Sequence, residues 1–171
     1  MGRLLRIVVL LALVTAPMSS AAFAGSASTT FTVSATVIKN CTISAANIAF
    51  GNYDPLVANA VTPLDLSSTV TVACTKGTVA TVGLDAGQNA AFATGTTRAM
   101  TSGGGSPTYL SYEIFKDAGH TTVWGNAGAA LVNYTAASKA SVALTDYGRI
   151  LAGEDQPVGA YSDTVTATIT F

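Results

Sequence analysis

Few residues of this 171-residue chain could carry reactive chemistry, and the two cysteines, Cys41 and Cys74, are the clearest candidates. Together with the single histidine, His120, they could not complete a zinc shell of four ligands without carboxylates. An even pair of cysteines in an exported chain most simply forms a disulfide. We therefore predict a Cys41–Cys74 bond, no metal site and no other cofactor.

Catalytic arrangements are hard to find among the remaining polar residues. His120 lies in a polar loop, where we expect an exposed histidine, and no nucleophile with a recognisable motif stands beside it. Glu154 and Asp155 are adjacent, so on a strand they would face opposite ways, and we favour a solvated turn for them. The glycine triplet 103–105 lacks the Lys-Ser/Thr and the helix of a phosphate loop. The sequence predicts a protein that is not an enzyme.

The aromatic residues leave a sugar-binding surface open as an alternative, because aromatic rings stack on saccharides. Packing in the core and at sheet edges is the interpretation that we favour for them. A monomeric secreted carbohydrate-binding module therefore stays as an alternative function. The aromatic residues concerned are Tyr109, Tyr112, Trp124, Tyr134 and Tyr161.

The first 24 residues have the pattern of a signal peptide. Arg3 and Arg6 give a basic start, residues 7–16 form an uncharged apolar run, and Ala22-Phe23-Ala24 offers small residues for cleavage. A membrane anchor is the competing interpretation, but a run of about ten residues is too short to cross a bilayer, which takes roughly 20. We expect a soluble, exported mature chain, residues 25–171, without a membrane span.

The composition of the mature chain excludes nucleic acid as a main partner. The whole chain has eight Lys and Arg against nine Asp and Glu and a pI near 5.6, and removal of residues 1–24 takes away two of the arginines. No basic surplus is left to neutralise a row of phosphates. The mature chain is rich in Thr, Val, Ala and Gly and has very few Lys, Glu, Arg or Gln, the residues that favour exposed helices, which predicts an all-β fold.

Alternating apolar residues predict about seven or eight short antiparallel strands, which is typical of a two-sheet sandwich in a single domain. Val70, Val72 and Cys74 share one face of such a strand. The same pattern recurs at residues 80–84, 110–114 and 142–144. We therefore expect the cysteine at position 74 to point inward.

Both ends of the mature chain carry regular alternation. The C-terminal residues alternate with threonine, and their apolar members are Val165, Ala167, Ile169 and Phe171. A flat strand edge of this kind invites another strand, so we predict that these residues line an acceptor groove. Residues 29–38 are also expected to form a strand, and its apolar members are Phe31, Val33, Ala35 and Val37. Lys39-Asn40 interrupts the pattern, so this segment is predicted to be a donor arm, 25–38, attached to a body, 39–171.

In order and spacing, several short segments resemble the spore coat protein U domain family, which includes the Csu-type subunits of archaic chaperone–usher pili in Gram-negative bacteria. The resemblance covers essentially all of the mature chain. The matching segments are Cys41-Thr42-Ile43, Phe50-Gly51-Asn52-Tyr53-Asp54, Val72-Ala73-Cys74, Leu110-Ser111-Tyr112, Phe115-Lys116-Asp117, Trp124-Gly125, Tyr147-Gly148-Arg149-Ile150 and Gly159 through Phe171.

This resemblance implies an immunoglobulin-like β-sandwich that lacks its last strand and is completed by another chain. It implies a periplasmic chaperone that first lends a strand, an outer-membrane usher, and other copies or related subunits as later partners. The function implied is that of a structural shaft or minor subunit of a surface fibre in adhesion or biofilm, exported through the periplasm. A spore-coat or other secreted coat protein of the same fold is the alternative.

Overall fold

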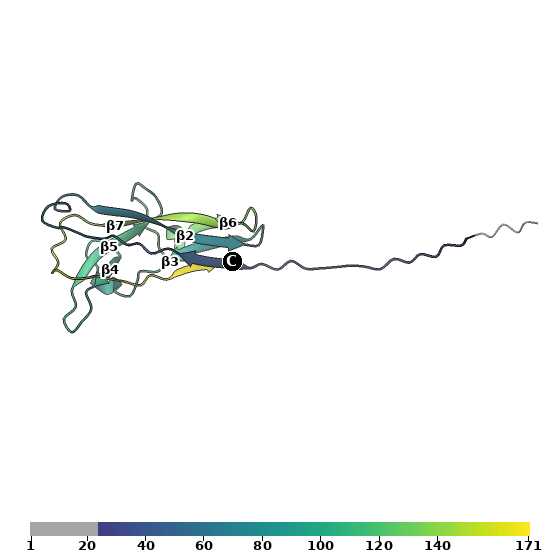
Figure 1. Cartoon of the computed structure of the whole chain (residues 1–171), viewed down its shortest axis with the longest axis horizontal. Helices are drawn as coiled ribbons and strands as arrows, with labels where there is room; N and C mark the ends of the chain where they lie inside the picture. Colours follow the sequence, from purple (N-terminus) through teal and green to yellow (C-terminus); the bar gives the residue numbers. More distant parts are fainter. Residues whose placement is uncertain (1–23) are drawn as a thin grey trace, which may run out of the picture. The chain divides into compact units, whose positions relative to one another are not determined.

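The computed structural model describes residues 24–171 (Figure 1). The expected signal peptide, 1–24, lies outside the described residues except for its last position, so it stays a prediction. The described chain divides after Thr36 into two units, and each is described by itself. Within the described part, no helix is long and apolar enough to span a membrane.

The second unit, residues 37–171, is a two-sheet β-sandwich in which every strand pairing is antiparallel. One sheet has five strands in the order β1-β2-β7-β5-β4, and the other has three in the order β6-β3-β8 (Figure 1). Two short 3₁₀ turns, Ala90–Phe92 and Gly128–Ala130, are the helical elements of the described chain. The all-β prediction is confirmed. The strands are β1 Cys41–Ala45, β2 Leu64–Cys74, β3 Val79–Leu84, β4 Arg98–Thr101, β5 Tyr109–Phe115, β6 Val132–Thr135, β7 Val142–Ile150 and β8 Ala167–Thr170.

The pairing of β1 with β2 places the two cysteines opposite each other. Cys41 is the register partner of Cys74, and a disulfide joins them. Cys74 is 3% exposed and follows Val70 and Val72 on the buried face of β2. The predicted disulfide and the predicted inward direction of Cys74 are both confirmed.

The core lies between the two sheets and is built around Trp124. Its side chain is fully buried, and its indole Nε1 donates a hydrogen bond to the carbonyl oxygen of Val82 in β3 at 3.0 Å. Arg98 and Glu113 form a buried ion pair beside it. Arg98 also donates from Nη2 to the carbonyl oxygens of Leu84 and Trp124. Because these acceptors belong to β3 and to the segment beside it, the arginine joins the two sheets at this level.

The expected strand at residues 29–38 is absent, because residues 24–40 carry no strand assignment. An extended segment becomes a β-strand only when its backbone groups pair with another strand, so alternation alone does not produce one. At the C-terminus the strand is also shorter than expected. Val165 precedes β8 and Phe171 follows it.

Candidate functional site

The sandwich is open along one side, where an edge strand of each sheet is left without a second partner. β1 pairs with β2 only, and β8 pairs with β3 only, so each ends its sheet. The two strands lie close together, but no ladder of backbone hydrogen bonds joins them in the described structure. Both strands therefore keep an edge of N–H and C=O groups to which a further strand could pair, and we call this pair of edges the groove.

The inner wall of this groove is apolar along β8. Val165, Ala167 and Ile169 are half-buried and pack against the core, whereas the threonines between them are exposed. Ile43, the apolar residue of β1 on the facing edge, is half-buried in the same way. Phe171 is 49% exposed. The alternation expected for the C-terminal residues is thus present, and their role as an acceptor groove stays a prediction.

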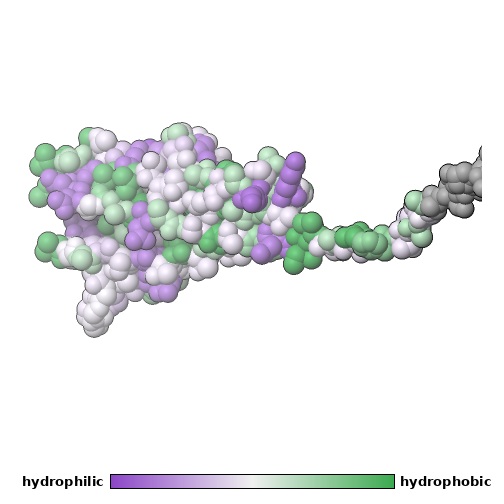
Figure 2. Space-filling model, turned by 45° about the vertical axis from the view of Figure 1, so that its right-hand side comes forward, coloured by the Kyte–Doolittle hydropathy of each residue, from purple (hydrophilic) through white to green (hydrophobic). Residues whose placement is uncertain are grey.

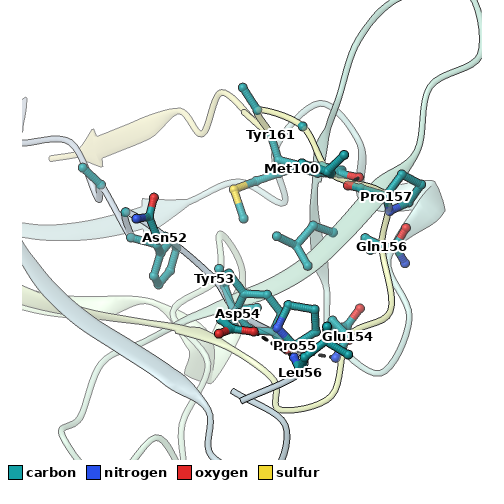
Figure 3. Close-up of a pocket in the computed structure, with 18 of the residues that line it drawn as sticks. Asn52, Tyr53, Asp54, Pro55, Leu56, Met100, Glu154, Gln156, Pro157 and Tyr161 are labelled. Atoms are coloured by element: carbon teal, nitrogen blue, oxygen red, sulfur yellow. Dashed lines mark hydrogen bonds between the residues drawn. The ribbon is translucent and has the colours of Figure 1, made fainter. Parts of the chain in front are cut away.

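A cavity of about 740 Å³ adjoins the segment that leads into β8 (Figure 3). The cavity lies between the segment 48–56, which follows β1, and the segment 154–161, which precedes β8. Its apolar lining includes Ile48, Phe50, Met100, Leu110, Ile150 and Tyr161. The sequence did not place a site here, although the alternation of Ile48 and Phe50 was a signal for a strand-like edge.

Asp163 fixes the segment that leads into β8. Its Oδ1 accepts hydrogen bonds from the backbone N–H of Gln88 at 2.9 Å and from Nδ2 of Asn89 at 3.0 Å. Its Oδ2 accepts one from the hydroxyl of Tyr112 at 2.8 Å. Burial, and next the bond to Asp163, raise the pKa of Tyr112 far above its usual value, so this hydroxyl remains a donor.

Asp85 fixes the same segment at Thr166, just before β8. Its Oδ1 accepts hydrogen bonds from the backbone N–H groups of Thr166 at 2.9 Å and Gly87 at 3.0 Å. Burial acts to raise the pKa of Asp85, but the hydrogen bonds from Thr166 and Gly87 outweigh it, and the pKa lies below its ordinary value. Ser162 and Thr101 exchange two backbone hydrogen bonds nearby. The groove wall is therefore fixed in place before anything binds to it.

Glu154 and Asp155 do not form a carboxylate pair. Glu154 is half-buried and lines the cavity, and burial raises its pKa, whereas Asp155 is exposed. The hydroxyl of Tyr53 connects the two walls of the cavity. It donates to the carbonyl oxygen of Leu151 at 2.7 Å and accepts from the backbone N–H of Glu154 at 2.9 Å. Figure 3 shows Tyr53 and Glu154 in the cavity lining.

The N-terminal unit carries the other predicted site. Phe31 and Val33 are each 84% exposed, and Ala35 is exposed as well. Val37, at the start of the second unit, is also 84% exposed. A run of apolar side chains in this state is a candidate for burial against a partner.

The expectation of an exposed histidine is wrong. The His120 side chain is 9% exposed and its ring lies edge-on to Phe115 and Tyr147, with centroid distances of 5.2 and 6.1 Å. Its Nε2 is 3.7 Å from Asp65, whose carboxylate is bound by Arg149. Edge-to-face contacts with these two aromatic rings, which the loop composition did not signal, hold the histidine inward.

The aromatic residues do not form a shared platform for sugars. Trp124, Tyr112 and Tyr134 are buried in the core, at 8% exposure or less. Tyr109 stacks on Phe92 with ring centroids 4.0 Å apart. Tyr161 alone of the five lines the cavity, and its hydroxyl bonds to the side chain of Thr108 and to the backbone of Pro157.

Comparison with known proteins agrees with the open sandwich. The model of the spore coat protein U domain family matches residues 27–168. The chain belongs to this family. Another protein similar to it is Protein U of Myxococcus xanthus, which is 33% identical over 174 residues, spanning 94% of this chain and 96% of that protein.

The spore coat protein U fold of this chain also resembles a solved structure from a pilus system. That structure is the CsuC-CsuE chaperone-tip adhesion subunit pre-assembly complex from archaic chaperone-usher Csu pili of Acinetobacter baumannii. The TM-score is 0.56 and the sequence identity is 25%, over 80% of this chain. The match spans 41% of the length of the Csu chain. The immunoglobulin-like sandwich expected from the sequence is thus shared with a protein of that complex.

Proposed function

We propose that this protein is a structural subunit of a secreted surface fibre, in which the arm of one copy completes the open sandwich of the next. The open groove between β1 and β8 carries the proposal. It provides two backbone edges without a second partner strand, and every second side chain along β8 is half-buried. No chemistry is required of the protein in this role.

The arm fits the groove in pattern and in length. Its apolar residues, Phe31, Val33, Ala35 and Val37, recur with the same period of two as the groove residues Val165, Ala167, Ile169 and Phe171. The arm, residues 25–38, has 14 residues, and the groove edge 161–171 has 11. An inserted arm would therefore pair along the whole edge, from β8 to the cavity.

Burial of apolar side chains and backbone pairing both favour insertion of the arm, and the ordering of the arm opposes it. Burial of Phe31, Val33 and Val37 contributes about 1.5–3 kcal/mol each, or roughly 5–9 kcal/mol together. Each backbone hydrogen bond to the groove edge adds about 1 kcal/mol net. Ordering a free arm costs about 1–2 kcal/mol per residue, which offsets much of this gain when the arm binds unaided. An assembly partner that keeps the groove open until exchange is therefore part of the proposal.

A periplasmic chaperone and an outer-membrane usher are the proposed assembly partners. The similarity to a chaperone–subunit pre-assembly complex supports the chaperone. By analogy with the same pilus system, we also propose the usher, passage through a Gram-negative periplasm and a role in adhesion or biofilm. The fibre would then reach the cell surface, in agreement with the predicted signal peptide.

A coat protein of the same fold is the second candidate. The identity of 33% with Protein U over almost the whole of both chains favours it. Electron microscopy of cells that express this chain with and without its neighbouring genes separates the two candidates. Thin surface fibres that require those genes support the pilus, and a continuous outer layer supports the coat.

The donor role of the arm is tested by a pair of substitutions on its two faces. Val33→Asp places a charge on the face that enters the groove, at a cost of several kcal/mol. Ser34→Asp places the same charge on the opposite face and serves as the control. With the assembly genes present, wild type and Ser34→Asp should give a ladder of multimers on an unheated gel, and Val33→Asp should give none. A normal ladder from Val33→Asp would show that this face does not join the subunits.

A further inference from the structure

One end of the sandwich body carries acidic and apolar side chains and no basic one. We call it the acidic end; it consists of the loops 46–63, 102–108 and 151–161. Its charged residues are Asp54, Glu154 and Asp155. Hydrogen bonds from the backbone N–H of Asn59 to Asp54 O and from Gly153 N–H to Asn59 O hold two of these loops together.

The acidic end also exposes large hydrophobic side chains. Leu56, Val57 and Val61 are 79–87% exposed, and Val158 is fully exposed. Figure 2 shows hydrophobic residues gathered at one end of the body. Exposed apolar side chains beside carboxylates are typical of a surface that contacts another protein.

The opposite end carries lysines and no Asp or Glu. We call it the basic end; it consists of the segments 37–40, 75–78 and 136–141, with Lys39, Lys76 and Lys139 all exposed. Backbone hydrogen bonds join the three segments, because Thr75 N–H donates to Asn40 O and Gly77 N–H donates to Ala136 O. Val37 and Ile38 are 84% and 73% exposed at the same end.

The two ends are too far apart to contact each other within one copy. β2 runs between them over 11 residues, from Leu64 beside the acidic end to Cys74 beside the basic end. A strand of that length spans roughly 35 Å. Any contact between the ends therefore joins two copies.

The arm is attached to the body at the basic end by a very short tether. Thr75 Oγ1 donates a hydrogen bond to the carbonyl oxygen of Ile38 at 3.1 Å, so the body begins two residues after Thr36. Two residues reach at most about 7 Å. The basic end of a donor copy must therefore lie close to the place where its arm leaves the groove of the accepting copy.

The direction of insertion decides which ends meet. β1 and β8 run in opposite directions, so an arm between them is antiparallel to one strand and parallel to the other, and the charges where the arm leaves the groove decide between the two directions. An arm antiparallel to β8 leaves the groove beside the 154–161 segment, at the acidic end. An arm parallel to β8 would leave beside Phe171 and bring three lysines against three lysines.

We propose that, in the fibre, the basic end of each copy docks onto the acidic end of the copy that accepts its arm. Lysine ammonium groups face the carboxylates of Glu154 and Asp155, and Ile38 faces the exposed apolar residues of the 54–61 loop. This second contact rests on the proposed function. Arm insertion is then accompanied by a contact between the two bodies, in which opposite charges face each other. This contact sets the angle between successive subunits.

The test is zero-length carbodiimide cross-linking of assembled wild-type multimers, followed by boiling, gel analysis and peptide mapping. The reagent joins a lysine amine to a carboxylate only when the two are in contact. We expect boiling-resistant multimers with links from Lys76 or Lys139 to Glu154 or Asp155, and their yield should fall several-fold in 1 M salt, where charges are screened within about 3 Å. Lys116, which donates to the carbonyl oxygens of Ala129 and Leu131, is the internal control and should give no such links.

Charge reversal gives the matched variants. Lys139→Glu should lower the cross-link yield several-fold, and Lys139→Glu combined with Asp155→Lys should restore it through the exchanged pair. An intact unheated ladder with no links between the two ends would overturn the docking and leave arm insertion standing. Lysine-to-lysine links between basic ends would show parallel insertion and overturn it as well. Absence of the unheated ladder in wild type would overturn the proposed function and the docking together.

Discussion

Asp163 is expected to control the stability of the groove wall, because its carboxylate accepts three hydrogen bonds that fix the segment before β8. In Asp163→Ala the hydroxyl of Tyr112, a residue that is 5% exposed, loses its acceptor. A buried donor left without a partner costs about 1–3 kcal/mol. The other two donors are less buried and can bond to water, so each adds about 1 kcal/mol. The total is about 3–5 kcal/mol, a large part of the 5–15 kcal/mol that stabilises a typical domain.

Urea unfolding of the purified full-length monomer measures this loss. With a dependence of about 2 kcal/mol per molar urea, the midpoint should fall by roughly 2 M. Hydrogen exchange should also accelerate at the amides of 165–171. Asp155→Ala is the control, because its side chain is exposed and accepts no hydrogen bond in the described structure, and its effect should stay within about 0.5 kcal/mol. If Asp163→Ala unfolds at the same urea concentration as wild type, the carboxylate does not hold the edge.

Three further predictions concern the disulfide, a buried carboxylate and the groove. Replacement of Cys41 and Cys74 by serine should lower the free energy of unfolding by about 2–5 kcal/mol, and non-reducing peptide mapping of the exported wild type should recover one linked peptide pair instead of free thiols. Burial raises the pKa of Asp146 in the folded state. The stability that this carboxyl contributes is therefore complete below its unfolded pKa and is lost as the pH rises through its folded pKa. Asp146→Asn should unfold at a higher urea concentration than wild type at pH 7, and this difference should disappear below about pH 4. Phe171→Asp should abolish recovery of a periplasmic chaperone complex and lead to degradation, and a stable monomer independent of the chaperone would count against the pilus proposal.

The parts of this fold that the sequence predicts are those set by local alternation. Val70, Val72 and Cys74 show a buried face in the sequence and in the structure, and the threonine repeat after Asp163 gives the half-buried face of β8. The pairing of the cysteines was predictable from export and from their even number. These features depend on residues two positions apart or on covalent chemistry, which is why they can be read without the fold.

The rest depends on contacts between residues far apart in the chain. The cavity at the end of the groove exists because segments 48–56 and 154–161 are brought together, about 100 residues apart, by bonds such as Tyr53 to Leu151. His120 is buried because Phe115 and Tyr147 meet it from two strands. Residues 29–38 form no strand in the described structure although their alternation is regular, because a strand needs a partner to pair with.

The central claim, that the arm of one copy fills the groove of another, is tested most directly with a body lacking the arm and a synthetic arm. The body is residues 39–171, and the peptide is the arm, residues 25–38. The peptide should bind with one-to-one stoichiometry by calorimetry and raise the melting temperature of the body, as should a peptide with Ser34→Asp, while a peptide with Val33→Asp should do neither. Failure of the wild-type peptide to bind, or equal binding by the Val33→Asp peptide, would contradict the account.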